Sequence, residues 1–202
     1  MKATRIVLPG VLCSFLAFSF LLKAQSPAVN ESVNPKESAA KLQPGAYVWN
    51  GTAWNPMQQI NMAGGGLKHV GKMFVPGLTP QMVWTFRDSQ APVQVRESKP
   101  LFCYKFLAAM AGIPNAPSGR DLVVARFDQK KDHRELQTTS GGNMFTFKSG
   151  LSKDRMPNVD ITELDAGTFL VSPREPLAAG EYILSASTMG INGYDFGFHP
   201  LK

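Results

Sequence analysis

The feature that most constrains this chain is a series of short segments with strand character, separated by turn residues and not interrupted by a long amphipathic helix. Alternating polar and apolar residues mark strands with one buried face, and Gly, Pro and Asn-Gly pairs mark the turns between them. Besides a hairpin over 47–54, the strand candidates are residues 81–86, 93–96, 101–107, 122–127, 134–138, 144–147, 159–164, 168–172, 182–187 and 194–198. The pattern indicates an all-β sandwich or barrel. We expect a single β-sandwich of roughly nine or ten short strands.

The N-terminal residues 1–24 have the three parts of a secretory signal peptide. Lys2 and Arg5 are positively charged, residues 6–22 form an uncharged and mostly apolar run, and Ala24 is the small residue before the expected cleavage site. Cleavage there predicts export to the periplasm or the extracellular space. The alternative is an uncleaved N-terminal anchor, the one arrangement in which we expect contact with a membrane.

Residues 25–43 differ from the rest of the chain because they contain almost no bulky apolar side chain. This composition predicts a disordered linker, with at most one helical turn over 38–42. Residues 44–202 are then the β-sandwich domain, which is long enough to bury a core of its own.

Charge gives little support for a nucleic-acid partner. The formal net charge of +6 falls to +3 when Lys2, Arg5 and Lys23 of the leader are set aside. The run 128–135 contains three Lys or Arg residues and three carboxylates, so its formal charge is zero. We interpret it as a solvated hairpin tip and expect no nucleic-acid binding.

Cysteine usage agrees with export but adds no cross-link. Cys13 leaves with the leader, so Cys103 is the single cysteine of the mature chain. It lies in an apolar strand pattern, which predicts a buried and inert thiol. The alternatives are an intermolecular disulfide and a nucleophile, and the latter would need a cationic or histidine neighbour.

The sequence contains no motif that assigns a metal, a cofactor or a catalytic centre. His69, His133 and His199 are far apart along the chain, without the short spacings of metal ligands. The alternative to a non-enzymatic protein is a small secreted hydrolase of the glycosidase type. It would use the neighbouring carboxylates Glu163 and Asp165, with or without His133, if these groups lined one cleft.

Aromatic and basic side chains provide the candidate binding residues. Trp49 and Trp54 flank an Asn-Gly turn, and a tryptophan exposed on such a hairpin can stack on a glycan or anchor a protein. A glycine-rich loop carries Lys68, His69 and Lys72, which are suited to an anionic partner. The expected partner is therefore an envelope glycan or protein.

One short pattern, Leu-x-x-Gly-x-aromatic, occurs at residues 42–47, 164–169 and 177–182. It predicts a tight bend at the glycine, followed by a strand whose first aromatic side chain points inward. The third instance is similar to the strand start and tyrosine corner of immunoglobulin-like and prealbumin-like sandwiches.

The stretch from Phe102 to Phe198 also resembles a group of uncharacterised exported bacterial β-proteins. The motifs that carry this resemblance are residues 120–127, 134–136, 180–182 and 194–197. The resemblance implies an exported β-fold and assigns no activity, cofactor or site residue. Taken together, the sequence predicts an exported, non-enzymatic β-sandwich that serves the bacterial cell envelope as a binding or structural accessory.

Overall fold

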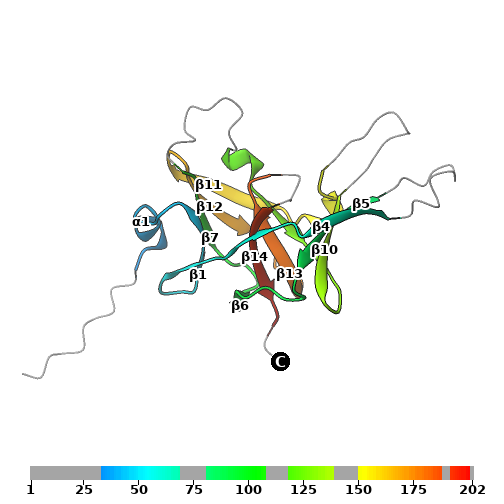
Figure 1. Ribbon diagram of the computed structural model, residues 1–202. Coiled ribbons are helices and arrows are strands. Elements are labelled where there is room, and N and C mark those ends of the chain that lie inside the picture. The colour runs from blue at the N-terminus through cyan, green and yellow to red at the C-terminus, as the bar shows by residue number, and fades with distance from the viewer. Residues whose placement is uncertain (1–32, 69–80, 108–117, 139–149, 188–191, 201–202) are drawn as a thin grey trace, which may run out of the picture. The chain divides into compact units, whose positions relative to one another are not determined.

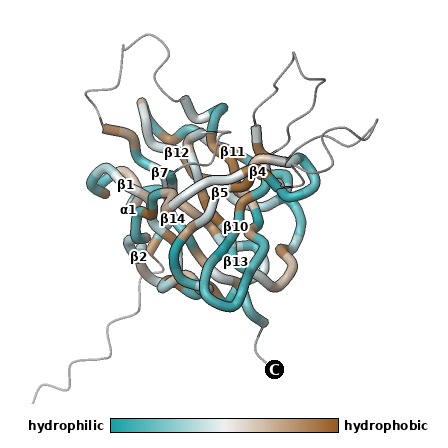
Figure 2. Tube along the Cα trace, turned by 45° about the vertical axis from the view of Figure 1, so that its right-hand side comes forward, coloured by the Kyte–Doolittle hydropathy of each residue, from teal (hydrophilic) through white to brown (hydrophobic). Residues whose placement is uncertain are grey.

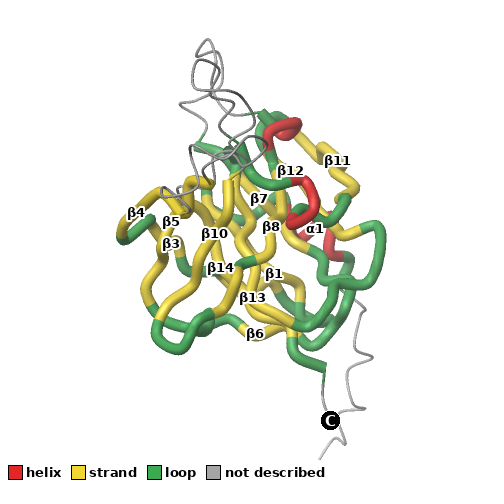
Figure 3. Tube along the Cα trace, turned by 90° about the vertical axis from the view of Figure 1, so that its right-hand side faces the viewer, coloured by secondary structure: helices red, strands yellow, loops and turns green. Residues whose placement is uncertain are grey.

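The computed structural model describes residues 33–68, 81–107, 118–138, 150–187 and 192–200. The signal peptide and its cleavage site, His69, Lys72 and the strand expected over 144–147 lie outside the described residues. Strands dominate the described chain and helices are few and short, which confirms the all-β prediction (Figure 3).

Fourteen strands form three sheets in the described part of the chain, more strands than the pattern predicts. Sheet A comprises, in spatial order, β11 (Val159–Asp165), β12 (Thr168–Pro173), β7 (Phe102–Lys105), β1 (Gly45–Trp49) and β2 (Trp54–Pro56). Sheet B comprises β3 (Gln59–Asn61), β14 (Asn192–Phe198), β13 (Gly180–Ser185) and β8 (Val123–Arg126), with β6 (Gln94–Val95) parallel to β14. Sheet C comprises β4 (Gly64–Lys68), β5 (Gln81–Arg87), β10 (His133–Thr138) and β9 (Asp128–Gln129). The helical elements are α1 (Pro35–Ala39) and the 3-10 turns η3 (Gly119–Asp121) and η4 (Lys153–Arg155).

Sheet B is covered on both faces. On β13, Tyr182 and Leu184 belong to the core cluster that includes Phe102 and Val171 of sheet A, whereas Ile183 packs with Phe86 and Leu136 of sheet C. Figure 1 shows β13 and β14 between β7 and β12 on one side and β5 and β10 on the other. The third layer therefore also covers the face opposite Tyr182 and Leu184, and Ser185 on that face is fully buried.

Two chain segments connect sheets B and C, one at each edge, because each runs from a strand of sheet B into a strand of sheet C. Between β8 and β9, the Phe127 amide donates to the Glu181 carbonyl (2.9 Å). Between β3 and β4, the Ala63 amide donates to the Thr85 carbonyl (2.8 Å). Two bent segments therefore pass from one sheet to the other, and the two sheets enclose a common interior.

The three Leu-x-x-Gly-x-aromatic segments each contain a glycine with a positive φ angle. These angles, which favour glycine over other residues, are 144° at Gly45, 88° at Gly167 and 155° at Gly180. In the last segment, the Tyr182 hydroxyl donates to the Ala178 carbonyl four residues earlier (2.5 Å). This bond satisfies the polar end of a side chain whose ring lies in the core.

The segment 25–43, expected to be a disordered linker, contains helix α1 near its C-terminal end. Asn34 caps this helix, and the Ala39 side chain is fully buried against sheet A. The Lys105 ammonium donates to the Ala40 carbonyl (2.8 Å). Tertiary contacts thus order residues 34–40, although their composition favours disorder. No helix among the described residues is long and apolar enough to cross a membrane.

Candidate functional site

The Trp49/Trp54 hairpin forms as the Asn-Gly turn predicts. Its two tryptophans are directly paired between β1 and β2. The Asn50 side-chain carbonyl accepts hydrogen bonds from the amides of Thr52 (3.0 Å) and Ala53 (2.8 Å), which fixes the turn. The two indole rings meet edge to face, with 5.2 Å between their centroids. Each ring therefore limits the orientation of the other.

The two tryptophans have different surroundings. The Trp54 indole N–H points to helix α1, where the Pro35 carbonyl (3.2 Å) and the Ser38 hydroxyl (3.0 Å) accept from it. Trp49, also half-buried, lines a cleft of about 400 Å³. Trp54 thus anchors the hairpin to the fold, and Trp49 is the tryptophan that faces a hollow of the surface.

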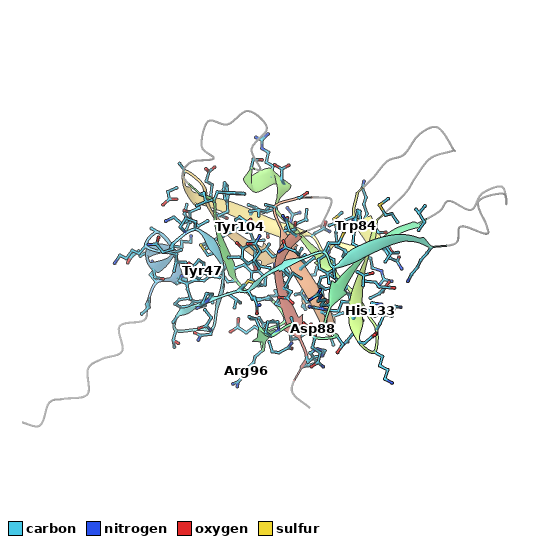
Figure 4. The ribbon with its side chains drawn as sticks, in the orientation of Figure 1. Tyr47, Trp84, Asp88, Arg96, Tyr104 and His133 are labelled. Carbon is cyan, nitrogen blue, oxygen red and sulfur yellow. The ribbon has the colours of Figure 1, made fainter. Side chains whose placement is uncertain are left out.

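The cleft beside Trp49 combines an aromatic side chain with polar ones. The residues that line it are Val48, Trp49, Asn50, Asn55, Val93, Gln94, Val95, Arg96, Glu97 and Pro100. The side chains of Asn55, Gln94 and Arg96 are exposed. The Gln94 side-chain amide donates to the Ala91 carbonyl (2.8 Å), so Gln94 offers a ligand mainly its side-chain oxygen, whereas Asn55 and Arg96 also offer donors. Arg96 is labelled in Figure 4. Aromatic surface together with a few oriented polar groups is typical of small-molecule sites.

Lys68, expected to contact an anion, is already paired. Its ammonium contacts the Glu135 carboxylate, which Lys130 and His133 also approach, at 3.6 Å and 3.5 Å. Burial opposes the ionisation of Glu135, but the bonds to Lys68 and His133 and the nearby charges of Lys68 and Lys130 together outweigh it and lower the pKa of that carboxyl. The bond to Asp132 raises the pKa of His133. These charges therefore compensate one another on sheet C.

The carboxylates of the hydrolase alternative do not meet His133. Glu163 and Asp165 are exposed on β11 of sheet A, and His133 lies on sheet C, where its ring contacts Asp132 and Glu135. A register shift between Glu163 and Asp165 also interrupts the alternation that predicted a shared face. In the described residues, then, the three groups do not form one catalytic cluster.

Cys103 is fully buried in the middle of sheet A, as its apolar strand pattern predicts. Burial raises the pKa of its thiol to about 11, because a thiolate is poorly solvated there. The thiol is therefore protonated near neutral pH, which agrees with an inert core residue.

The most unusual feature of the molecule is a buried cluster of charges between sheets B and C. The side chains of Arg134, Glu181 and Asp195 are exposed by 2 %, 0 % and 0 %. One guanidinium nitrogen of Arg134, Nη1, lies 2.7 Å from Asp195 Oδ2 and 3.6 Å from Glu181 Oε2. The guanidinium also lies over the Phe127 ring, 5.0 Å from its centroid. One cation thus bridges two carboxylates across the layers.

The same cluster holds the loop that follows β5. Arg134 donates through Nε to the Asp88 carbonyl (3.0 Å) and through Nη2 to the Arg87 carbonyl (3.2 Å). The Ala91 amide donates to Glu181 Oε2 (2.5 Å). Asp88, labelled in Figure 4, has a positive φ of 63°, which is uncommon for a residue other than glycine. The buried charges therefore determine the path of this loop.

Glu181 has a further partner at the rim of the cluster. The His199 ring nitrogen Nε2 lies 2.9 Å from Glu181 Oε1, and the His199 side chain is 44 % exposed. Gly197 leaves room for this carboxylate, because a Cβ there would lie 2.6 Å from Glu181 Oε1. Glu181 is thus well supplied with partners, in contrast to Asp195.

The sequence pattern did not predict this cluster, because it indicated that Arg134 lies in a solvated hairpin tip. Figure 2 shows why, since the chain is mostly hydrophilic along β10. One signal was present: Arg134 and Leu136 are two positions apart, so a strand places them on the same face, and Leu136 is fully buried. The tip of the hairpin, with Lys130 and Lys131, is exposed as expected.

Metal ligation and similarity to known proteins add no assignment. Among the described residues, no group of three or more His, Cys, Asp or Glu is placed to hold a metal ion. No protein-family profile matches the chain, and comparisons with curated proteins and with solved structures found no match. The site has to be interpreted from its own geometry.

Proposed function

We propose that this chain is an exported, non-enzymatic accessory of the bacterial cell envelope that binds a glycan in the cleft beside Trp49. The observation that carries the proposal is the position of Trp49, which lines a cleft among exposed polar side chains while Trp54 anchors the hairpin. Export follows from the signal peptide expected over residues 1–24, and an envelope partner follows from export.

A glycan fits this cleft better than an apolar ligand. Sugar rings present C–H groups that pack on an indole face, and hydroxyl groups that need donors and acceptors. Asn55 and Gln94 offer amides, and Arg96 offers charged donors. Because the cleft measures about 400 Å³, we expect it to hold one or two sugar units of a longer chain.

Titration of the mature protein with soluble peptidoglycan fragments tests the proposal, with calorimetry or tryptophan fluorescence as the readout. Trp49→Ala should weaken binding about tenfold or more, because it removes the stacking surface. Trp54→Phe is the matched control. It removes the indole bonds to α1 and should lower stability, with little change in affinity. Equal loss of affinity in both variants, or no binding by the unaltered chain, contradicts the proposal.

Export is tested separately from binding. Expression of the full chain, followed by fractionation and N-terminal sequencing, should yield a mature protein that begins near Gln25 in the periplasm or the medium. An intact N-terminus in the membrane fraction supports the uncleaved anchor instead. Binding by a protein retained in the cytoplasm would contradict the envelope role and leave the glycan site intact.

A further inference from the structure

A second hollow lies at the edge where sheets B and C join, and no residue of sheet A lines it. It measures about 560 Å³. The residues that line it are Gln58, Ile60, Asn61, Met62, Ala63, Phe86, Arg87, Asp88, Gln90, Pro92, Arg134 and Asp195. Two members of the buried charge cluster therefore reach its wall.

Asp195 is the member of the cluster with the fewest partners. Among the described residues, the one close partner of its carboxylate is Arg134 Nη1, 2.7 Å from Oδ2, and no other residue donates a hydrogen bond to either oxygen. The other two nitrogens of that guanidinium donate to backbone carbonyls, so Arg134 does not form a bidentate pair with Asp195, in which two parallel hydrogen bonds would join them. Asp195 Oδ1 is thus a buried acceptor without a donor.

The charges of the cluster do not balance. Glu181 and Asp195 carry two negative charges when ionised, and Arg134 supplies one positive charge. The half-exposed His199 contacts Glu181 and not Asp195, so a positive charge on its ring would compensate Glu181. Burial raises the pKa of Asp195, and the bond to Arg134 only partly opposes this. A second cation beside Asp195 would complete the compensation.

We propose that this hollow binds a small organic cation, a primary ammonium group carried on a short apolar chain, whose N–H groups donate to Asp195. Ile60, Met62 and Phe86 provide apolar wall for the chain. The side-chain amides of Gln58, Asn61 and Gln90 offer further acceptors for the ammonium. A hollow of this volume is within the range that holds small ligands.

The positive charge of Arg134 does not prevent this binding. Its Nη1 already faces two carboxylates, at 2.7 Å and 3.6 Å, so the cluster without a ligand has a net negative charge when both carboxylates are ionised. At the rim, the exposed Arg87 and Asp88 carry opposite charges. A metal ion is a poorer candidate, because the described residues bring no third His, Cys, Asp or Glu ligand to this place.

The test uses n-butylammonium as the probe and n-butanol as its neutral analogue of the same length. Binding is followed by calorimetry and by the NMR signals of the Arg134 guanidinium. The unaltered protein should bind butylammonium at least about tenfold more tightly than butanol, because butanol brings no charge to Asp195. Equal affinity for the two probes, or no saturable binding of butylammonium, overturns the proposal.

Two variants locate the binding. Asp195→Asn keeps the shape of the side chain and removes its charge, and it should weaken butylammonium binding about tenfold or more. Asp160→Asn is the control, since it changes an exposed carboxylate on sheet A. Ala63→Phe, at an exposed position of the wall, should fill the hollow and abolish binding without touching the charges. If Asp195→Asn fails to fold, Ala63→Phe decides: butylammonium binding that survives in it overturns the proposal.

Discussion

The two faces of sheet B are built from the same strands but are stabilised by different interactions. Toward sheet A the contacts are apolar and aromatic: Phe196 lies 4.6 Å from Phe102 between ring centroids and stacks on Tyr182 at 5.3 Å. Toward sheet C, β13 and β14 present Glu181 and Asp195 to Arg134. Alternation along two strands thus produces an apolar layer on one face. On the other face it produces a layer, here called the charged layer, in which the three charges lie beside apolar side chains such as Ile183 and Leu136.

The difference matters because the two layers are stabilised in different ways. Burial of apolar surface adds stability in proportion to the area removed from water, whatever the pH. A buried ion cluster costs desolvation energy, which is recovered only while every charge keeps its partner. We therefore expect the apolar layer to lose stability gradually with side-chain size. In the charged layer, the removal of one charged side chain should destabilise the whole cluster, because the remaining charges lose their partner.

The largest expected effect is that of Arg134→Met. This change keeps a long side chain over Phe127 but leaves Glu181 and Asp195 buried without their shared cation. We expect a loss of about 4 kcal/mol in the free energy of unfolding, measured by urea denaturation. Arg174→Met is the matched control. It breaks an exposed ion pair with Asp160 and should cost less than about 1 kcal/mol. Similar losses in the two variants would contradict the distinction between the layers.

A smaller effect is expected for Leu184→Ala, in the apolar layer. Leu184 is fully buried between sheets A and B, so its truncation removes apolar contacts and leaves a cavity. The expected loss is about 3 kcal/mol, with the same value at every pH at which the protein folds. Leu67→Ala, at a side chain that is 45 % exposed, should change stability little. A strong pH dependence of the Leu184→Ala effect would show that the two layers are coupled.

These two layers also show how far the sequence predicts the fold. Alternation over residues 182–186 places Tyr182 and Leu184 on one face, and both are buried in the core, because one period-2 pattern suffices to define one buried face. It did not reveal that Ser185 is buried as well. Alternation alone does not identify a strand that is covered on both faces. The second covering layer must be known, and for β13 that layer is sheet C, whose residues are distant along the chain.

The candidate sites follow the same rule. The Trp49/Trp54 hairpin was predictable because Asn-Gly specifies a turn within a few residues, and paired tryptophans follow from its register. The buried cluster was not, because Arg134, Glu181 and Asp195 belong to three separate strands. Local composition assigns a charged side chain to the surface, and only the tertiary fold brings three of them together. Each lies in one of the short motifs that carry the family resemblance, but no spacing along the chain relates them.

The smallest expected signal is a change in how stability depends on pH, and it separates the layers most sharply. Burial raises the pKa of Asp195 in the folded protein above its value in the unfolded chain, so the folded state binds this proton more tightly. The stability linked to this group is therefore fully present below the unfolded pKa of about 3.9 and is lost as the pH rises through the raised folded pKa.

Asp195→Asn removes this titration and leaves the neighbouring groups in place. Arg134 faces Asp195 from sheet C, Glu181 faces it from β13, and His199 acts through Glu181, so all three are common to both proteins. The free energy of unfolding of the unaltered protein, minus that of Asp195→Asn, should fall as the pH rises. Urea denaturation at several pH values measures it, with Asp165→Asn on exposed β11 as the control. A difference that stays constant or grows with pH would mean that Asp195 is ionised and fully compensated by Arg134, and the charged layer would then be as complete as the apolar one.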